Sequence, residues 1–149
     1  MKIVLQRVSR ARVTVEGSVA GEIGTGLCLL VGIEKGDDEK AAAYSAQKIL
    51  GLRVFSDTEG RMNLSVKDVR GEVLAVSQFT LAGSVRKGRR PSFDGAEDPE
   101  PAQRLFERFV ALLKAGGVRV ATGVFGAMME VELINDGPVT FILEPPMRS

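Results

Sequence analysis

Leu27-Cys28-Leu29-Leu30-Val31-Gly32-Ile33 is a continuous apolar run in the first quarter of the chain. Seven residues suit a strand better than a helix, and an unbroken run of this length is typical of a fully buried strand. Cys28 lies inside the run, and we interpret it as a small buried hydrophobic residue and not as a nucleophile. The run therefore predicts a buried strand, from which the rest of the fold can be worked outward.

Other strands are expected on both sides of this run, wherever short stretches rich in Val, Ile and Leu are bounded by turn residues. Glu16-Gly17-Ser18 is expected to be the turn of a hairpin. One arm of the hairpin holds Val13 and Val15, and the other holds Val19 and Ile23. The other expected strands cover residues 2–8, 27–33, 52–55, 72–79, 118–121, 129–134 and 139–143.

Two helices are expected between these strands. The first begins in Gly36-Asp37-Asp38-Glu39, where an aspartate can cap it, and ends at Gly51. The second runs from about Pro101 to Ala115. With many strands, two helices and no linker, residues 1–149 are expected to form a single mixed α/β domain whose helices pack on sheets.

The composition excludes several classes of chemistry. A chain of 149 residues is the size of one domain. It contains no histidine, which rules out Ser-His-Asp and Cys-His catalysis and histidine-ligated zinc. Its single cysteine can form neither an intramolecular disulfide nor a thiolate zinc cluster. The net charge is only +1, so an affinity for nucleic acid must come from a local patch.

No export segment and no membrane span are expected. Gln6, Arg7 and Arg10 interrupt the apolar start of the chain, which is unlike a signal peptide. No apolar run approaches the ~20 residues that a helix needs to cross a bilayer. We therefore expect a cytoplasmic protein with no membrane partner. The tail, residues 144–149, is expected to be loose.

Ser77-Gln78-Phe79-Thr80, at the end of an expected strand, is the first candidate site. Hydroxyls and an amide at a strand end that leads into a long loop can line a substrate pocket. The alternative is that these side chains only satisfy the turn. Thr80 could be a nucleophile, but a hydroxyl needs a base, and no histidine exists to activate it.

Arg86-Lys87-Gly88-Arg89-Arg90 is the second candidate, in a long loop expected over residues 82–101. Four cations in five residues, followed by Phe93, suit a phosphate backbone and a stacked base. A loop this long in a small domain is more often functional than idle. The alternative is a solvated loop whose charge is neutralised by Asp94, Glu97, Asp98 and Glu100.

Asn135-Asp136-Gly137-Pro138-Val139-Thr140 is the third candidate. Gly-Pro between two expected strands predicts a turn, and a bond before proline is where a cis peptide can occur. The functional interpretation is a rigid backbone element that presents carbonyl oxygens to a ligand. From the residues alone, the polar strand end, the basic loop and the rigid turn favour a phosphate-bearing ligand.

The first and third of these segments resemble the two signature motifs of the D-aminoacyl-tRNA deacylase family. The motifs are Ser77-Gln78-Phe79-Thr80-Leu81 and Asn135-Asp136-Gly137-Pro138-Val139-Thr140. Two motifs in this order, with matching flanks, argue against a chance likeness. The resemblance extends over nearly the whole chain, including residues 6–8, 31–37, 48–53, 62–65, 87–93 and 125–126.

The resemblance implies a fold and an activity. The fold would be a single domain of mixed, barrel-like sheets with two packed helices. The activity would be that of a carboxylic ester hydrolase, which frees a D-amino acid from the 3′ end of tRNA and also removes glycine mischarged on tRNA(Ala). Rejection of L-aminoacyl-tRNA would make this a chiral proofreading step in translation. The family needs no metal, and no cofactor is implied.

The resemblance also implies a homodimer with its active site at the subunit interface. Gly137 and Pro138, joined by a cis peptide bond, would enter the partner's pocket and exclude L-amino acids. Met129 would lie near the pocket rim. The pocket itself would be lined by Ser77, Gln78, Phe79 and Thr80, and tRNA would be bound by Arg86, Lys87, Arg89 and Arg90.

The implied chemistry agrees with the missing histidine. The 2′-hydroxyl of the terminal adenosine can orient or activate the attacking water, while the N–H of Phe79 or Thr80 stabilises the oxyanion. An acyl-enzyme on Thr80 is the rival mechanism. Two other classes of function stay open: a non-catalytic RNA-binding module that uses residues 86–90, and an RNA-independent amidase or peptidase acting on D-residues.

Overall fold

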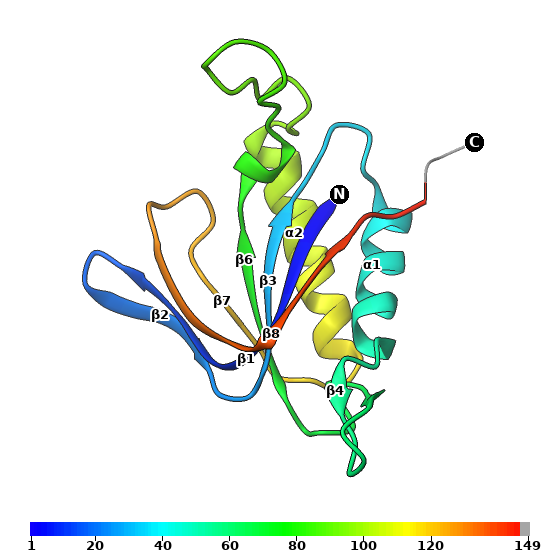
Figure 1. Cartoon of the computed structure of the whole chain (residues 1–149). Helices are drawn as coiled ribbons and strands as arrows, with labels where there is room; N and C mark the ends of the chain where they lie inside the picture. Colours follow the sequence, from blue (N-terminus) through cyan, green and yellow to red (C-terminus); the bar gives the residue numbers. More distant parts are fainter. Residues whose placement is uncertain (147–149) are drawn as a thin grey trace.

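A computed structural model describes residues 1–146, and β3 (Gly26–Gly32), the predicted buried strand, lies at its centre. β3 pairs antiparallel with β1 (Lys2–Val15) and parallel with β6 (Glu72–Ser77). β2 (Ser18–Ile23) and β7 (Val120–Thr122) complete the sheet in the order β2-β1-β3-β6-β7. β8 (Glu130–Leu143) pairs antiparallel with β1 along most of its length (Figure 1).

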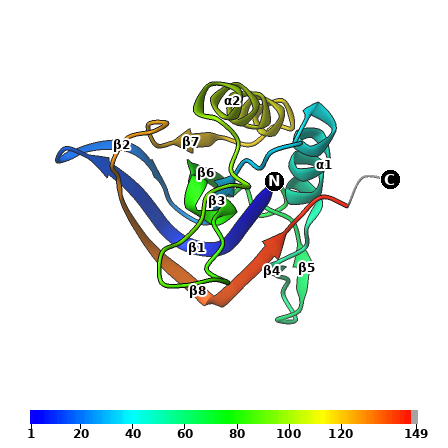
Figure 2. The ribbon, with the colours of Figure 1, turned by 90° about the horizontal axis from the view of Figure 1, so that it is seen from above.

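The sheet curls until its two ends meet. Gly21 of β2 lies against Thr122 of β7, so closely that a Cβ on Gly21 would come 2.4 Å from the Thr122 carbonyl oxygen. A residue without a side chain is therefore required where the two strands approach. Seen from above, β1, β2 and β8 curve around one side of the molecule and the helices cover the other (Figure 2). The predicted mixed, barrel-like single domain with two packed helices is confirmed in its fold class.

Two apolar cores use opposite faces of the sheet. Leu27, Leu29 and Val31 of β3 belong to the larger core, which the sheet forms with α1 (Glu39–Gly51) and α2 (Pro99–Ala115). Cys28 points into a smaller core inside the curve of the sheet. Burial raises the pKa of the Cys28 thiol to about 11, so the thiol stays neutral at physiological pH. Because both faces of β3 are buried, its sequence is apolar at every position.

The residues at the N-termini of the two helices explain where each helix begins. The Asp38 carboxylate accepts a hydrogen bond from the Ala41 N–H at 3.0 Å and caps α1. α2 begins at Pro99, two residues before the expected start, because proline suits the first turn of a helix. None of the helices in residues 1–146 is long and apolar enough to span a bilayer.

The expected turn at Asn135–Pro138 is wrong. β8 continues through it as one strand, and the Gly137–Pro138 peptide bond within it is cis. Asn135 pairs with Val8 and Thr140 pairs with Gln6, so four residues of β8 bulge out between two paired positions. Turn-forming residues can produce either a reversal or a bulge, and pairing with the same β1 on both sides keeps the strand direction unchanged.

Other element boundaries also differ from expectation. β1 is one continuous strand, because its second half extends the first and pairs with both β2 and β8. The segment expected as a strand over 52–55 pairs only at its end, as β4 (Phe55–Ser56), with the unforeseen β5 (Met62–Leu64). Glu144–Pro146 have no regular structure, and the last three residues of the expected loose tail lie outside the described residues.

Candidate active site

The first candidate segment forms a single 3-10 turn at the end of β6. Ser77 is the last residue of the strand, and η1 (Phe79–Ala82) follows at once. Gln78 donates its N–H to the Val31 carbonyl at 2.8 Å, which anchors the turn to β3. The N–H groups of Phe79 and Thr80 begin η1 and have no backbone partner within the described residues. They are therefore available to an external acceptor.

Gly32, the last residue of β3, sets the position of η1. A Cβ on Gly32 would come 2.8 Å from Leu81 Cβ and 3.2 Å from the Gln78 carbonyl oxygen. Distances this short leave no room for a side chain. The turn therefore packs directly on the backbone of β3, and its exposed N–H groups are held by a rigid strand end.

Thr80 has no base beside it. Gln78 donates its Nε2–H to Thr80 Oγ1 at 3.1 Å, and both side chains come from the same turn. A side-chain amide donor orients a hydroxyl but cannot remove its proton. The site therefore offers hydrogen-bond donors and a positioned hydroxyl, not an activated nucleophile.

The basic loop lies next to this turn. Ser84 and Ser92 exchange backbone hydrogen bonds of 2.7 and 2.8 Å, which close the loop around the four cations. Arg86, Lys87, Arg89 and Arg90 are all exposed, and none of them forms an ion pair within residues 1–146. Two of the four nearby acids are engaged elsewhere: Glu97 Oε1 accepts the Asp98 N–H at 2.8 Å, and Glu100 binds Arg104 at 2.8 Å. The four cations are therefore not neutralised by ion pairs within residues 1–146.

An exposed aromatic pair joins the turn to the loop. The rings of Phe79 and Phe93 meet edge to face with centroids 5.2 Å apart. Phe79 nevertheless remains 60% exposed. Apolar rings beside unpaired cations form a surface on which a nucleic-acid base can stack while its phosphates are bound.

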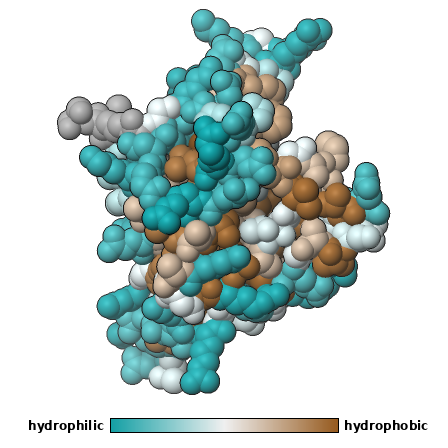
Figure 3. All heavy atoms as spheres, turned by 180° about the vertical axis from the view of Figure 1, so that it is seen from behind, coloured by the Kyte–Doolittle hydropathy of each residue, from teal (hydrophilic) through white to brown (hydrophobic). Residues whose placement is uncertain are grey.

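Met129, the residue before β8, lies beside the end of β7. Its Sδ is 2.5 Å from the place that a Cβ on Gly123 would take, and Gly123 directly follows β7, whose Thr122 pairs with Ala75. Met129 also packs against the core cluster that contains Val76, the residue before Ser77. Exposed apolar residues lie near it in the chain: Met128 is 91% exposed and Val124 is 48% exposed. Figure 3, which views the molecule from behind, shows hydrophobic residues gathered on that face.

Arg7 braces the bulge that carries Gly137 and Pro138. Its Nε donates to the Asp136 carbonyl at 2.9 Å and its guanidinium also donates to the Val54 carbonyl at 2.8 Å. The Arg7 side chain is only 11% exposed, whereas Gly137 and Pro138 are exposed. A largely buried cation thus supports an exposed backbone element.

One chain does not bring the two signature motifs together. The bulge lies opposite Arg7 of β1. Arg7 pairs with Leu27 of β3, and Leu27 pairs with Val73 of β6, so the bulge is level with Val73. Ser77 lies four residues further along β6. At roughly 3.3 Å per residue, this separates the motifs by about 13 Å along the strands. β1 and β3 also lie between β8 and β6. Ser77–Thr80 and the basic loop share one region, and Gly137–Pro138 stand apart from it.

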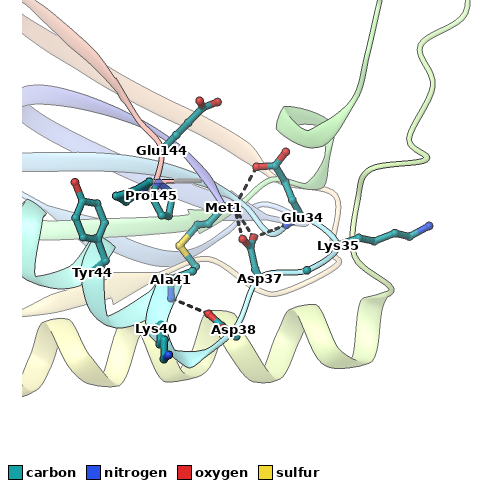
Figure 4. A pocket seen from close by; sticks show the side chains of 12 residues that line it. Met1, Glu34, Lys35, Asp37, Asp38, Lys40, Ala41, Tyr44, Glu144 and Pro145 are labelled. Atoms are coloured by element: carbon teal, nitrogen blue, oxygen red, sulfur yellow. Dashed lines mark hydrogen bonds and ion pairs between the residues drawn. The ribbon is translucent and has the colours of Figure 1, made fainter. Parts of the chain in front are cut away.

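The hollow of about 770 Å³ between the N-terminus and α1 is a different feature. Glu34 and Asp37 point at the Met1 amino group, whose nitrogen is 3.1 Å from Glu34 Oε1 and 2.6 Å from Asp37 Oδ1 (Figure 4). These carboxylates are used in a structural ion pair. None of the predicted site residues lines the hollow. The described residues also contain no group of three or more His, Cys, Asp or Glu that could hold a metal ion.

Comparison with known proteins identifies the family of the chain. Residues 4–144 match the family model described as D-Tyr-tRNA(Tyr) deacylase. The chain belongs to this deacylase family. The D-aminoacyl-tRNA deacylase of Geobacter sulfurreducens is 58% identical over 149 residues, which cover 100% of this chain and 98% of the relative.

Two solved structures resemble the deacylase fold described here. One, titled c-Myc DNA Unwinding Element Binding Protein, has a TM-score of 0.92 and 44% identity, covering 99% of this chain and 100% of the other. The second, described as a probable eukaryotic D-amino acid tRNA deacylase, has a TM-score of 0.81. It is 18% identical and covers 97% of this chain and 98% of the other, and at that identity it supports the fold alone.

Two residues that shape this candidate site had no role expected from the sequence. Gly32 is the only residue between Leu27 and Ile33 without a side chain, and a glycine in a strand can mark a close backbone approach. Arg7 is in phase with the apolar Ile3 and Leu5, at a position where the alternation of the strand predicts another apolar residue. Both deviate from their local pattern, but only the packing shows what each deviation serves.

Proposed function

We propose that this chain hydrolyses the ester that joins a D-amino acid to the 3′ end of tRNA and thereby proofreads chirality in the cytoplasm. Family membership supports the reaction. The observation that carries the assignment to these residues is the 3-10 turn at Phe79–Ala82, with unpaired N–H groups, beside four unpaired cations. Cations can hold the phosphates of the acceptor end while the turn meets the ester.

Hydrolysis at this turn needs only donors and a positioned water. The water oxygen attacks the ester carbonyl carbon, and negative charge develops on the carbonyl oxygen. The N–H groups of Phe79 and Thr80 stabilise that oxyanion. The bond from the carbonyl carbon to the ribose 3′-oxygen then breaks, and the 3′-oxygen takes up the proton that the attacking water loses, as the free amino acid and tRNA leave.

We assign the activation of water to the substrate and not to Thr80. The only hydrogen bond of the Thr80 hydroxyl within the described residues comes from the Gln78 amide, which is not a base. The neighbouring 2′-hydroxyl of the terminal ribose is held beside the ester by the substrate itself. Because this hydroxyl is already fixed next to the ester, it can orient the water without the entropic cost of binding a separate catalytic group.

We further propose that two copies of the chain complete the site. β8 is a 14-residue strand, and within residues 1–146 no other strand pairs with its outer edge. Long open edges favour pairing with another chain. Ile142 is 68% exposed on this strand, with Val131, Ile134 and Phe141 also exposed. A homodimer that covers β8 would allow Gly137 and Pro138 to reach the partner's pocket, from which they are separated in their own chain.

A filter made of backbone would explain how one site accepts different D-amino acids. Carbonyl oxygens of Gly137 and Pro138 would hold the amino group and Cα, which all substrates share. An L side chain would then point into the main chain and clash. Glycine has no side chain to clash, so glycine mischarged on tRNA(Ala) would be removed as well.

The test is the release of amino acid from D-tyrosyl-tRNA, L-tyrosyl-tRNA and free D-tyrosyl ester by the purified chain. Rapid release from the D-tyrosyl-tRNA alone is expected. Binding of tRNA without release would instead identify an RNA-binding module. Equal turnover of the free ester would identify an RNA-independent hydrolase of D-residues.

A further inference from the structure

The bulge that carries Gly137 and Pro138 is shaped by the side chain of the residue that opens it. Asn135 pairs with Val8 of β1, and pairing resumes only at Thr140 with Gln6. Between these positions no residue of β8 is in register with a residue of β1, although the Arg7 side chain donates to the Asp136 carbonyl. The N–H and C=O groups of this segment therefore need partners from elsewhere.

Asn135 supplies those partners to Val139, the last residue of the bulge. Its Oδ1 accepts the Val139 N–H at 2.6 Å, and its Nδ2 donates to the Val139 carbonyl at 3.2 Å. The same Nδ2 donates to Thr140 Oγ1 at 3.0 Å, an oxygen that also accepts from Gln6 Nε2 at 3.4 Å. One side chain thus ties both ends of the bulge together and connects them to β1.

Only an amide meets this set of contacts. Val139 presents one donor and one acceptor to the same side chain, and an amide offers an acceptor oxygen and two N–H donors at once. Aspartate lacks the donors, and leucine lacks both. Val139 itself is buried, at 7% exposure, so loss of its partner would leave a backbone N–H unsatisfied.

We propose that Asn135 is a positioning residue for stereochemical discrimination: by clamping Val139 it fixes where Gly137 and Pro138 point. This inference rests on the proposed function, in which those two residues reject L-amino acids. Gly137 has φ +144° and contacts Val139 so closely that a Cβ on Gly137 would lie 2.6 Å from Val139 Cγ2. A shift of Val139 is therefore passed directly to Gly137.

The experiment compares the ratio of kcat/KM for D-tyrosyl-tRNA to that for L-tyrosyl-tRNA in wild type, Asn135→Ala, Asn135→Asp and Asp68→Ala. The ratio should fall by about tenfold or more in Asn135→Ala, because D-cleavage slows and L-cleavage rises. Asn135→Asp keeps the acceptor for the Val139 N–H and should lose less. It also carries the test if the alanine variant does not fold.

Asp68→Ala is the matched control, since the Asp68 carboxylate accepts the Ser65 N–H at 2.9 Å in a loop without site residues. It should lower the thermal midpoint and leave the ratio unchanged. A merely structural role for Asn135 would give the same result as this control. An unchanged ratio in the folded Asn135 variants overturns the positioning role.

Failure of the proposed function would be distinguishable. A wild-type chain that cleaves neither substrate, or both alike, defeats the proposed function whatever Asn135 does. The role of Asn135 is then decided by hydrogen exchange of the Val139 amide, which should become about tenfold faster in Asn135→Ala. Unchanged exchange at Val139 overturns it.

Discussion

Thr80 is the residue at which two mechanisms of ester hydrolysis differ. Its hydroxyl receives a hydrogen bond from Gln78 and has no base among its described contacts. We expect Thr80→Ala to retain kcat/KM within about tenfold of wild type, because it removes one hydrogen-bonding group and no proton acceptor. A D-aminoacyl-tRNA with a terminal 2′-deoxyribose should be cleaved about 10²–10⁴-fold more slowly, the usual scale of a lost acid-base group.

Wild type and Thr80→Ala are each assayed with the normal substrate and with the 2′-deoxy substrate. Thr80→Val is the control for side-chain volume. Single-turnover release of labelled amino acid measures each combination. A covalent aminoacyl adduct on Thr80, detected by mass spectrometry after acid quench, would replace this mechanism with an acyl-enzyme.

Among the elements, η1 depends on the absence of a side chain at Gly32. In Gly32→Ala the new Cβ would lie 2.8 Å from Leu81 Cβ, so η1 must move. We expect the free energy of unfolding to fall by about 1–3 kcal/mol, as for other overpacked sites. The kcat/KM should fall by about 10²-fold, because the N–H groups of Phe79 and Thr80 leave the oxyanion position.

Gly51→Ala is the control for this prediction. Gly51 ends α1, and a Cβ there meets nothing within 4 Å. Stability should be equal or higher by about 0.5–1 kcal/mol, since glycine is unfavourable within a helix. Urea unfolding and steady-state kinetics measure both variants. Full activity in Gly32→Ala would show that the position of η1 is not critical.

The loop closed by Ser84 and Ser92 should carry the salt dependence of tRNA binding. Replacing Arg86, Lys87, Arg89 and Arg90 by glutamine should weaken binding and reduce the slope of log K against log salt by about 3. That figure follows from a slope of roughly 0.7–0.9 for each phosphate that a cation neutralises. Discrimination between D- and L-substrates should persist, because these side chains meet phosphate and not the amino acid.

Four other exposed cations provide the matched control: Lys40, Lys48, Arg104 and Lys114 on the helices. Their replacement changes the net charge equally, so only a local role distinguishes the two variants. Filter binding over a range of salt concentrations measures both. Equal salt-dependence slopes in the two variants would show that the loop is a solvated segment with no special role in tRNA binding.

For the whole molecule, the proposed dimer predicts complementation between two defective chains. Gly137→Ala damages the filter, because its Cβ would lie 2.9 Å from the Val139 backbone nitrogen at a φ of +144°. Gly32→Ala damages the pocket. If each filter serves the other subunit, a heterodimer of these chains holds one site with both parts intact, and about half the wild-type activity per dimer should return.

Two affinity tags allow the heterodimer to be purified after co-expression and assayed against each parent homodimer. A heterodimer as inactive as its parents would place filter and pocket in the same chain. An active monomer, identified by light scattering at assay concentration, would remove the need for a second copy altogether.

The sequence alone predicts most of the elements, for a reason visible in β3. That strand is buried on both faces, so its short apolar run predicts a buried strand correctly. The bulge in β8 is different, because Asn135–Pro138 can end a strand or interrupt it, and only its pairing with β1 decides between these. β5 is not predictable from its own residues, because it has three of them and pairs only with the even shorter β4.

For the site, residue types alone determined what chemistry is available: no histidine anywhere, four clustered cations and a polar segment at a strand end. Which functional groups the chain contains depends on residue type alone and does not change with the fold. The tertiary structure decided the rest. It placed Gly32 under η1, Arg7 and Asn135 around the bulge, and β1 and β3 between the two motifs. Distances between segments far apart in the chain depend on strand pairing and packing, which no local pattern records.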